Sequence, residues 1–466
     1  MAKVKSKWVC QNCGYETVSY LGRCPDCGNF STFTEEISTP KIEIKTNSPS
    51  NAIAGSLVSS DLGYSKIDEI KLDETIRIKT KIEELDRVLG GGFVEGSLVL
   101  LAGDPGIGKS TLVLQAAKNI GDFGKKILYI CAEESPSQVK LRAQRLCANS
   151  ENLYVTAQNC LEEISNQIED LKPDFLVVDS IQSVFSAQIT SSSGTVSQIR
   201  ECTNILMRLA KLKNLTTIVI GHVTKEGNIA GPKVLEHMVD CVINFEGDKF
   251  RTYRMLRSIK NRFGPTSEVG VFSMNDDGLS EIKNPSEMFL SEKGGENCPG
   301  CTVIATVEGT RCLLLEVQAL VGNTPYPSPR RVARGVEYNR LLQILAVLEK
   351  RVGLNLSKQD VYINVIGGVD IIEPAADLGI AMAVLACVRD VCCKNDLVII
   401  GEIGLSGEVR PVDNLEKRLK EAQKLGFKEA IIPKISSATV LKQIQNLKIK
   451  TTQVSKVMDA ITKAMV

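Results

Sequence analysis

Short apolar runs alternate with amphipathic segments through the middle of this chain. Four runs are apolar over most consecutive positions and predict buried strands, at residues 97–102, 126–131, 175–178 and 216–220. Residues 111–120 place Leu112, Ala116 and Ile120 at helical spacing, and residues 134–147 also fit a helix. Strands that alternate with helices predict a mostly parallel sheet covered on both faces, which is an α/β architecture.

The pattern changes on either side of this alternation. Residues 37–65 are polar with weak periodicity, which predicts a flexible linker. A helix is expected at residues 81–89, and a hairpin at 242–245 and 253–257. Beyond residue 285, strands are expected at 302–306, 312–320 and 397–400, with 430–433 as the final short strand, and helices at 339–351, 375–389 and 415–425. We therefore expect four parts: a small module at 1–36, the linker at 37–65, and α/β domains at 66–285 and 286–466.

Composition narrows the class of protein. The 466 residues allow roughly three domains. The formal net charge of +1 gives no overall attraction to nucleic acid, so any contact with DNA must come from local patches. No apolar run approaches the ~18 residues of a membrane span, and the first residues do not resemble a signal peptide. An odd count of 15 scattered cysteines favours a reducing, cytoplasmic location over a disulfide scaffold.

A phosphate-binding motif joins the first strand to the first helix. The sequence GDPGIGKST fits G-x-x-x-x-G-K-[ST] in the strand–loop–helix context that this motif requires. Its glycines allow successive N–H groups to point at phosphate, and the helix N-terminus favours anions. Lys109 would reach the β- and γ-phosphates, and the Ser110 hydroxyl would bind Mg²⁺. The expected nucleotide-binding residues are Gly103, Asp104, Pro105, Gly106, Ile107, Gly108, Lys109, Ser110 and Thr111.

Acidic residues follow two of the predicted strands. Asp179 ends the strand at 175–178, where an acid would hold Mg²⁺ through water; the alternative is a helix cap. Glu133 ends the strand at 126–131, and we expect it to polarise the attacking water, with Glu134 as its rival. His222 ends another strand and either senses the γ-phosphate or is a buried polar residue.

Two pairs of cysteines near the N-terminus have the spacing of a metal site. Cys10, Cys13, Cys24 and Cys27 form C-x2-C-x10-C-x2-C, which predicts a closed tetrahedral zinc site with a structural role. So short a segment has too little core to fold without the metal. Nearby aromatic residues such as Trp8 favour packing in a small core over stacking on bases. The second motif of this type, Cys298 and Cys301, has no partner pair and is interpreted as incidental.

Local groups of cations are the remaining candidates. Lys260 and Arg262 either lie in a solvated turn or extend toward a nucleotide bound by a neighbouring subunit. Candidate DNA contacts are Lys225, Lys233, Arg330, Arg331 and Arg334. The last three follow a proline-rich turn, and the alternative is that they pair with acids across a subunit interface.

Several motifs together resemble the RadA (Sms) family of bacterial recombination and repair ATPases. They are the four-cysteine module, LGGGF at residues 89–93, the phosphate loop, AEES at 132–135, GHVTKEG at 221–227, GPKVLEH at 231–237 and KNRFG at 260–264. The resemblance covers nearly the whole chain. It implies a core similar to RecA and to ring helicases of the DnaB type.

The last domain is similar to the peptidase domain of the Lon protease, chiefly at residues 401–409 (GEIGLSGEV). Where Lon has its nucleophilic serine in Pro-Ser-Ala-Gly, this chain has Pro-Ala-Ala-Asp, with Ala375 at the serine position. The Lon lysine base falls at Glu416 in this sequence. Without serine and base acting together, we expect no peptide hydrolysis.

The resemblance implies a homohexameric ring that hydrolyses ATP with Mg²⁺ at subunit interfaces and moves on single-stranded DNA. Such a ring would promote branch migration of recombination intermediates beside a recombinase filament, with Lys260 and Arg262 directed at the neighbour's nucleotide. Two alternatives are an ATP-dependent protease, which Ala375 opposes, and a signalling or clock-type ATPase. The second would not need the zinc module or KNRFG.

Overall fold

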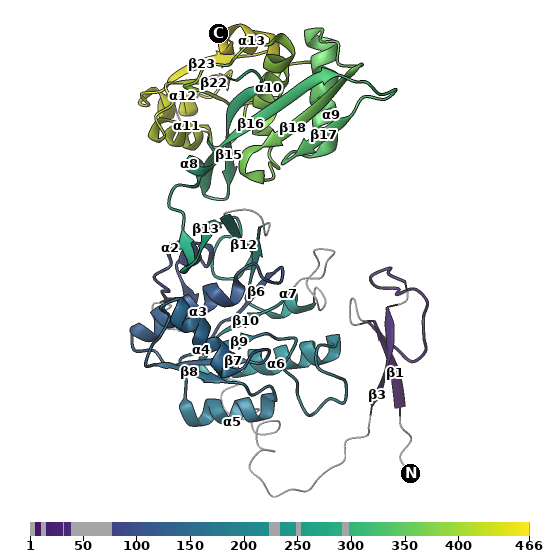
Figure 1. Cartoon of the computed structure of the whole chain (residues 1–466), viewed down its shortest axis with the longest axis vertical. Coiled ribbons are helices and arrows are strands. Elements are labelled where there is room, and N and C mark those ends of the chain that lie inside the picture. Colours follow the sequence, from purple (N-terminus) through teal and green to yellow (C-terminus); the bar gives the residue numbers. More distant parts are fainter. Residues whose placement is uncertain are drawn as a thin grey trace, which may run out of the picture. The chain divides into compact units, whose positions relative to one another are not determined.

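The computed structural model describes residues 5–10, 15–30, 32–38, 77–222, 234–247, 253–290 and 298–465. It divides into two compact units, Met1–Glu281 and Ile282–Val466. In Figure 1 the first runs from purple to teal and the second from green to yellow. Of the predicted linker at 37–65, all but Ile37 and Ser38 lie outside the described residues. Among those described, no helix is both long and apolar enough to span a bilayer.

The N-terminal module is a three-stranded antiparallel sheet in the order β2-β1-β3. Its strands are β1 (Lys5–Cys10), β2 (Glu16–Thr17) and β3 (Phe33–Ser38). Its core is a small cluster of Cys10, Cys24 and Phe33, against which Trp8, Leu21 and Cys27 pack. The ring of Trp8 meets that of Tyr20 edge to face at 5.1 Å between centroids. The module is therefore held by cysteines and aromatic rings rather than by a large apolar core.

The rest of the first unit is built on a nine-stranded sheet in the order β14-β13-β12-β11-β6-β10-β9-β7-β8. The strands from β11 to β8 in this order are parallel, whereas β12, β13 and β14 form an antiparallel extension. Their bounds are β6 (Leu98–Gly103), β7 (Ile127–Cys131), β8 (Leu153–Thr156), β9 (Phe175–Asp179), β10 (Thr216–Ile220), β11 (Cys241–Glu246), β12 (Tyr253–Asn261), β13 (Val269–Asn275) and β14 (Gly278–Glu281). A short separate pair, β4 (Arg77–Ile78) and β5 (Phe93–Val94), precedes the sheet. This confirms the α/β, mostly parallel architecture.

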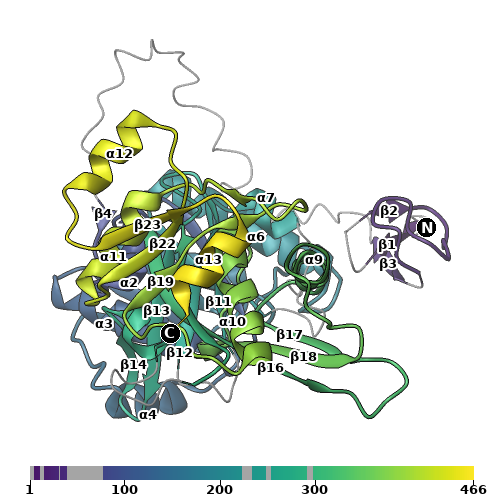
Figure 2. The ribbon, with the colours of Figure 1, turned by 90° about the horizontal axis from the view of Figure 1, so that it is seen from above.

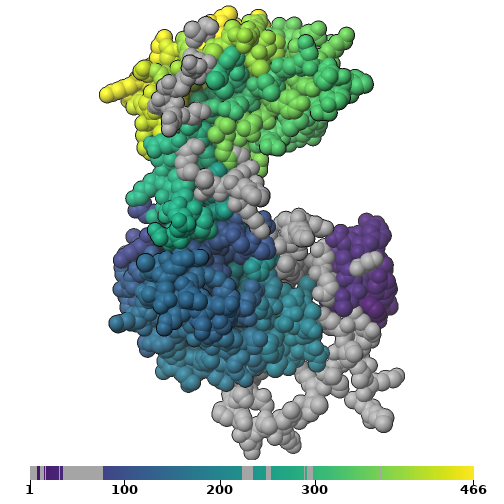
Figure 3. Space-filling view, viewed as in Figure 1, coloured from purple at the N-terminus to yellow at the C-terminus, as the bar shows by residue number. Residues whose placement is uncertain are grey.

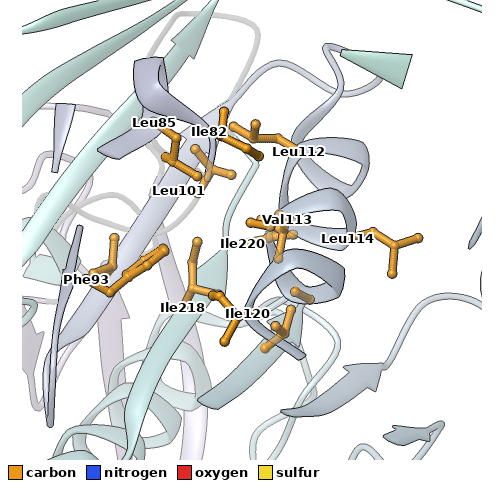
Figure 4. Close-up of a cluster of buried hydrophobic side chains, with 14 of the residues drawn as sticks. Ile82, Leu85, Phe93, Leu101, Leu112, Val113, Leu114, Ile120, Ile218 and Ile220 are labelled. Atoms are coloured by element: carbon orange, nitrogen blue, oxygen red, sulfur yellow. The ribbon is translucent and has the colours of Figure 1, made fainter. Parts of the chain in front are cut away.

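Helices cover both faces of this sheet, as the alternating pattern predicts. They are α2 (Glu83–Val88), α3 (Lys109–Asp122), α4 (Pro136–Arg145), α5 (Leu161–Leu171), α6 (Val196–Lys213) and α7 (Val234–Met238). Successive residues of β6 enter different cores: Val99 and Leu101 pack with α3, whereas Leu98 and Leu100 pack with residues of α5 and α6. Figure 4 shows Leu101 facing Leu112 of α3 in the first cluster. Because the central strands β6, β7, β9 and β10 are covered on both faces, their residues are apolar at consecutive positions.

The C-terminal unit is a second α/β domain with a seven-stranded sheet in the order β17-β18-β16-β15-β19-β22-β23. Its strands are β15 (Cys301–Glu308), β16 (Arg311–Asn323), β17 (Arg331–Arg334), β18 (Gln359–Val365), β19 (Leu397–Ile399), β22 (Glu429–Pro433) and β23 (Lys450–Val454), with a separate pair β20 (Glu402–Ile403) and β21 (Val409–Arg410). Its helices are α8 (Pro285–Met288), α9 (Tyr338–Val347), α10 (Asp377–Arg389), α11 (Leu415–Lys424), α12 (Ala438–Gln445) and α13 (Val457–Ala464). Figure 2 shows α11, α12 and α13 near β22 and β23.

Two expectations for this unit are wrong. Residues 430–433 do not form the final strand, because β23 pairs in parallel with β22. Its sequence KTTQV has no apolar run, so the pattern does not reveal it. The helix expected over 339–351 ends at Val347 and continues as a π-helical turn, Leu348–Val352. Figure 3 shows the described residues in space-filling form, with the N-terminal module in purple and the C-terminal unit in green to yellow.

Candidate active site

The phosphate loop connects the end of β6 to the start of α3. Gly106 and Gly108 both adopt left-handed backbone conformations, with φ of +78° and +115°, which an L side chain rarely adopts. A Cβ at Gly108 would also lie 2.7 Å from Cε of Met274. Gly108 caps α3, so the first N–H groups of the helix are directed at the loop. The arrangement is a cradle for an anion at a helix N-terminus.

Lys109 is buried, and its side chain forms hydrogen bonds with the backbone of the phosphate loop. Its Nζ donates to the carbonyl oxygens of Gly103 and Asp104, at 2.8 and 2.9 Å. Burial lowers the pKa of Lys109 to about 8, against the opposing influence of Asp179, Asp104 and Glu133. A phosphate group would replace neutral carbonyls with a charged acceptor, which favours the protonated lysine.

The two expected magnesium ligands meet although they come from different elements. Asp179 ends β9, and its carboxylate forms a hydrogen bond with the Ser110 hydroxyl at the start of α3. The Tyr129 hydroxyl of β7 donates to Oδ2 of Asp179 at 2.7 Å. Burial raises the pKa of Asp179, against these two hydrogen bonds. A carboxylate and a hydroxyl are hard oxygen donors, so this pair fits Mg²⁺.

The two candidate acids after β7 have different surroundings. Glu133 Oε1 accepts hydrogen bonds from Ser180 and, at 3.1 Å, from Ser183, and it lies 3.5 Å from Nε2 of His222. The hydrogen bond with His222, ahead of those from the serines, lowers the pKa of Glu133 to about 2. Glu134 instead pairs with Arg142 of α4. The geometry therefore favours Glu133 over its rival as the acid at the strand ends.

A carboxylate with so low a pKa is a weak Brønsted base. Glu133 is therefore better suited to orienting a water molecule than to removing its proton. His222, left open between sensor and buried polar residue, touches Glu133 through Nε2, while its buried Nδ1 has no hydrogen-bond partner among the described residues. Lys225 and Lys233, which follow His222 in the sequence, lie outside the described residues.

The KNRFG segment lies at the opposite edge of the sheet from the phosphate loop. Asn261 of β12 pairs with Cys241 of β11, and Cys241 pairs in turn with Val99 near the start of β6. The loop begins where β6 ends, at Gly103. Four residues of extended strand span about 13 Å, so this segment does not reach the nucleotide cradle of its own chain.

Both cations of this segment contact the turn between α7 and β11. Lys260 Nζ donates to the carbonyls of Glu236 and Val239, at 2.7 and 2.8 Å. Nη1 of Arg262 lies 3.2 Å from Oδ1 of Asp240, and the Arg262 side chain remains 53% exposed. The segment is thus bound to the domain rather than being a solvated turn.

KNRFG also packs on the LGGGF segment, a contact that links two motifs far apart in the sequence. Nδ2 of Asn261 donates to the Leu89 carbonyl at 3.2 Å, and Gly264 packs tightly on Gly90, where a Cβ on one glycine would lie 3.2–3.3 Å from Cα of the other. Arg77 donates to the Phe263 carbonyl at 2.7 Å and to the Leu89 carbonyl. Sequence reasoning missed Arg77, because a single arginine in a polar stretch gives no pattern.

The cysteines of the N-terminal module gather as a metal site requires. The sulfur atoms of Cys10, Cys24 and Cys27 lie within 4.8 Å of one another, while Cys13 lies outside the described residues. Thiolates in this arrangement fit Zn²⁺. In the described parts of the chain, Cys298 and Cys301 do not belong to such a group.

We expect the double substitution Cys24→Ser/Cys27→Ser to remove zinc from the purified protein, because two of four thiolate ligands are lost. Metal analysis by atomic absorption would report close to one ion per wild-type chain and none in the variant. Cys147→Ser, at an exposed cysteine of the nine-stranded domain, is the matched control. Undiminished zinc in the double variant would rule out this ligand set.

The three candidate arginines of the C-terminal domain differ in their surroundings. Arg331 donates to the carbonyls of Leu356, at 2.8 Å, and Gln359, so it holds the loop before β18. Arg330 is exposed and stacks on Tyr326, with its guanidinium 3.9 Å from the ring centroid. Arg334 is exposed as well. Arg330 and Arg334 are therefore the more exposed of the three, although Arg330 also forms hydrogen bonds with Tyr326 and Tyr362.

The peptidase-like region contains buried ion pairs. Ala375 is buried, and Asp377, two residues further along, binds Arg340 through two contacts of 2.5 Å. Arg418 binds Glu373 through contacts of 2.5 and 2.6 Å. Glu416, at the position of the Lon base, pairs with Lys420 on the surface of α11. These pairs were missed because their partners are 37 and 45 residues apart in the sequence.

Comparison with known families matches three parts of the chain separately. A family described as AAA domain matches residues 66–228, one described as Rubredoxin metal binding domain matches residues 8–35, and one described as Subunit ChlI of Mg-chelatase matches residues 340–436. Together with the site geometry, these matches identify an ATP-hydrolysing core, a zinc ribbon and a ChlI/Lon-like C-terminal domain. A solved KaiC-like protein from Pyrococcus horikoshii OT3 is 22% identical, with a TM-score of 0.39, and covers 45% of this chain and 99% of its own.

Curated relatives match almost the whole chain. Proteins named DNA repair protein RadA are 49% identical in Bacillus subtilis (strain 168) and 47% identical in Aquifex aeolicus, covering 93% of this chain in both cases and 93% and 94% of theirs. The relative of that name in Synechocystis sp. is 46% identical over all of this chain and 95% of its own. With identity near one half over nearly the full length of both partners, this protein belongs to the RadA family of DNA repair proteins.

Proposed function

We propose that this ATPase is a DNA-dependent motor that moves on single-stranded DNA and promotes branch migration of recombination intermediates. The observation that carries the proposal is that the nucleotide-binding residues and the two cations of KNRFG lie at opposite edges of the sheet. Lys109, Ser110, Asp179 and Glu133 converge at one edge of the sheet, while Lys260 and Arg262 lie at the other. If the cations of one subunit complete the nucleotide site of the next, they must lie at the opposite edge of the sheet from their own nucleotide site.

At the nucleotide edge, each residue has a distinct task. Lys109 leaves its two carbonyl partners to bind the β- and γ-phosphates, and the N–H groups at the start of α3 bind the same anion. Ser110 and Asp179 would hold Mg²⁺, which supplies positive charge to the phosphate oxygens. Glu133, held by Ser183 and His222, orients the attacking water. The carboxylate stays ionised because of these donors.

The far edge of the sheet supports assembly as a homohexameric ring. Within the phosphate loop of one chain, Lys109 supplies the positive charge, and charge spread in the transition state calls for a further cation. A ring brings Arg262 of one subunit to the nucleotide of the next. The ring would act in the cytoplasm on single-stranded DNA and branched intermediates, beside a recombinase filament.

Hydrolysis with and without DNA tests the motor directly. Single-stranded DNA should stimulate ATP turnover of the full chain severalfold, and a three-strand branched substrate should be converted to products only with hydrolysable ATP. Casein serves as the protease test, with no cleavage expected because Ala375 carries no nucleophile. ATP turnover that DNA does not change would contradict the motor and favour a signalling ATPase. Cleavage of casein would favour the protease.

Loss of the Tyr129 hydroxyl is expected to weaken the magnesium pair without disturbing the core. The ring of Tyr129 is fully buried, so Tyr129→Phe preserves packing and removes only the donor to Asp179. Outer-shell donors of this kind are typically worth about 10–100-fold in metal affinity. Titration of hydrolysis with Mg²⁺ should show a higher requirement, and Tyr154→Phe, on β8, is the control. An unchanged Mg²⁺ requirement would show that Tyr129 does not support the site.

Among the three C-terminal arginines, we expect Arg330 and Arg334 to contact DNA and Arg331 to stabilise the domain. Arg330→Ala/Arg334→Ala should lower the salt slope of DNA binding by roughly two units, one for each lost phosphate contact, while gel filtration still shows the ring. Arg331→Ala should instead lower thermal stability, because three carbonyls lose their donor. A broken ring in the double variant would assign these arginines to a subunit interface.

A further inference from the structure

Asp240 stands where the strand of the phosphate loop, helix α6 and the KNRFG segment meet. Its carboxylate is buried, with 3% of the side chain exposed. It is not one of the residues that bind the nucleotide or Mg²⁺ in the site described above. A buried carboxylate lowers the stability of the fold unless hydrogen bonds and opposite charges compensate for its lost hydration. The contacts of Asp240 are therefore informative about what the residue holds in place.

Two of these contacts fix Asp240 to β6. Its N–H donates to the Leu98 carbonyl at 3.0 Å, and its Oδ2 accepts from the Leu98 N–H at 3.1 Å. The residue is thus joined in both directions to the first residue of the strand that ends at the phosphate loop. A rigid strand between the two edges gives Asp240 a fixed position in the domain.

Two further contacts fix Arg262 to Asp240. The Arg262 N–H donates to the Asp240 carbonyl at 3.1 Å, and Nη1 lies 3.2 Å from Oδ1. Lys211 of α6 binds the other oxygen, Oδ2, at 2.8 Å, and its ammonium lies 5.9 Å from the centroid of the Phe263 ring. Among the described contacts, Oδ2 is therefore shared by Lys211 and the Leu98 N–H, whereas Oδ1 is contacted by Arg262.

The pairing leaves about half of the Arg262 side chain exposed. An arginine has five N–H donors in a rigid fork, and only Nη1 is directed at Asp240 in the defined contacts. The Arg262 side chain is 53% exposed, so it stays accessible to a ligand while Nη1 is held. A guanidinium anchored at one corner loses less conformational freedom when it binds phosphate than one that moves freely. Lys260, by contrast, uses its ammonium on carbonyls at the end of α7.

We propose that Asp240 is a positioning residue that presents Arg262 to the nucleotide of the neighbouring subunit. The proposal rests on the proposed function, in which Arg262 acts in trans. Asp240 touches no nucleotide itself. It holds one nitrogen of the guanidinium while the other donors bind the γ-phosphate as charge spreads during hydrolysis. Because β6 connects Asp240 to the phosphate loop of the same chain, the orientation of Arg262 is set by the core that binds this chain's own nucleotide.

Asp240→Asn tests this role with little change of volume. The amide oxygen still accepts from Leu98, but the charge that holds Arg262 is lost. We expect kcat for ATP in the presence of DNA to fall about tenfold with KM changed less than twofold, because binding residues are untouched. The control is Asp174→Asn, another acid that accepts from a backbone N–H and pairs with a lysine at the same sheet edge. It should leave both constants near wild type.

A double-mutant cycle separates positioning from general damage. If Asp240 acts only through Arg262, Asp240→Asn should lower kcat no further in an Arg262→Ala background. Independent, multiplicative losses, or a fall in Tm with matching loss of ATP binding, would mean that Asp240 is merely structural and would overturn the proposal. The cycle also reports on the underlying function. Full activity of Arg262→Ala would refute the trans role of Arg262, whereas an inactive Arg262→Ala with an active Asp240→Asn would refute the positioning role alone.

Discussion

Lys109→Ala is expected to lower ATP hydrolysis at least a hundredfold while the fold survives. The lysine ammonium donates its hydrogen bonds to loop carbonyls, at 2.8 and 2.9 Å, and the nearby carboxylate of Asp179 keeps its hydrogen bonds with Tyr129 and Ser110 when the lysine is removed. The lost charge clamp on phosphate is worth about 3 kcal/mol or more, which corresponds to two decades in rate. Steady-state phosphate release at saturating ATP and DNA measures the effect.

Lys118→Ala is the matched control, because Lys118 lies on the same helix and pairs with Asp122 one turn further along, at 2.8 Å, rather than with the phosphate loop. It should retain nearly full turnover. Circular dichroism and gel filtration of both variants confirm that the fold and assembly are kept. Hydrolysis by Lys109→Ala above about a tenth of wild type would contradict the assignment, since a tenfold loss corresponds to only about 1.4 kcal/mol.

Arg262→Ala is expected to leave nucleotide binding nearly intact and to lower hydrolysis by about 10³-fold, in the range found for arginines that act in trans. The reason is positional. Arg262 lies at the sheet edge opposite the phosphate loop, so it contributes nothing to the ground-state site of its own chain. Fluorescent-nucleotide binding and phosphate release, measured on the same preparation, separate the two effects.

Mixed rings distinguish action in trans from a local defect. Arg262→Ala and Lys109→Ala subunits are each inactive alone, but some interfaces of a mixed ring pair an intact loop with an intact arginine. We expect hydrolysis to reappear on mixing and to peak at an intermediate ratio. If native mass spectrometry confirms mixed rings and no ratio recovers activity, the trans role is excluded. Mixing Lys109→Ala with itself under a second tag controls for subunit exchange.

Much of the nucleotide site could be predicted from the sequence because its signals are local. The phosphate loop, its flanking strand and helix, and the acids after β7 and β9 occupy short stretches, and the ends of parallel strands meet at one edge by topology. The zinc ribbon is local in the same sense: two pairs of cysteines lie within 18 residues. The sequence could not choose between Glu133 and Glu134, since that depends on Arg142, Ser183 and His222, which come from three other elements.

By itself, the sequence determined the α/β class and the presence of an ATPase core and a zinc ribbon, because each depends on periodicity or spacing within one segment. Only the tertiary structure decided that KNRFG lies at the edge away from its own nucleotide, that Asp240 joins Arg262 to β6, and that Arg331 is engaged by carbonyls while Arg330 is exposed. These facts follow from strand register and from contacts between residues that are distant in the chain. Side-chain burial and hydrogen bonding at such contacts are set by packing, and no local pattern encodes them.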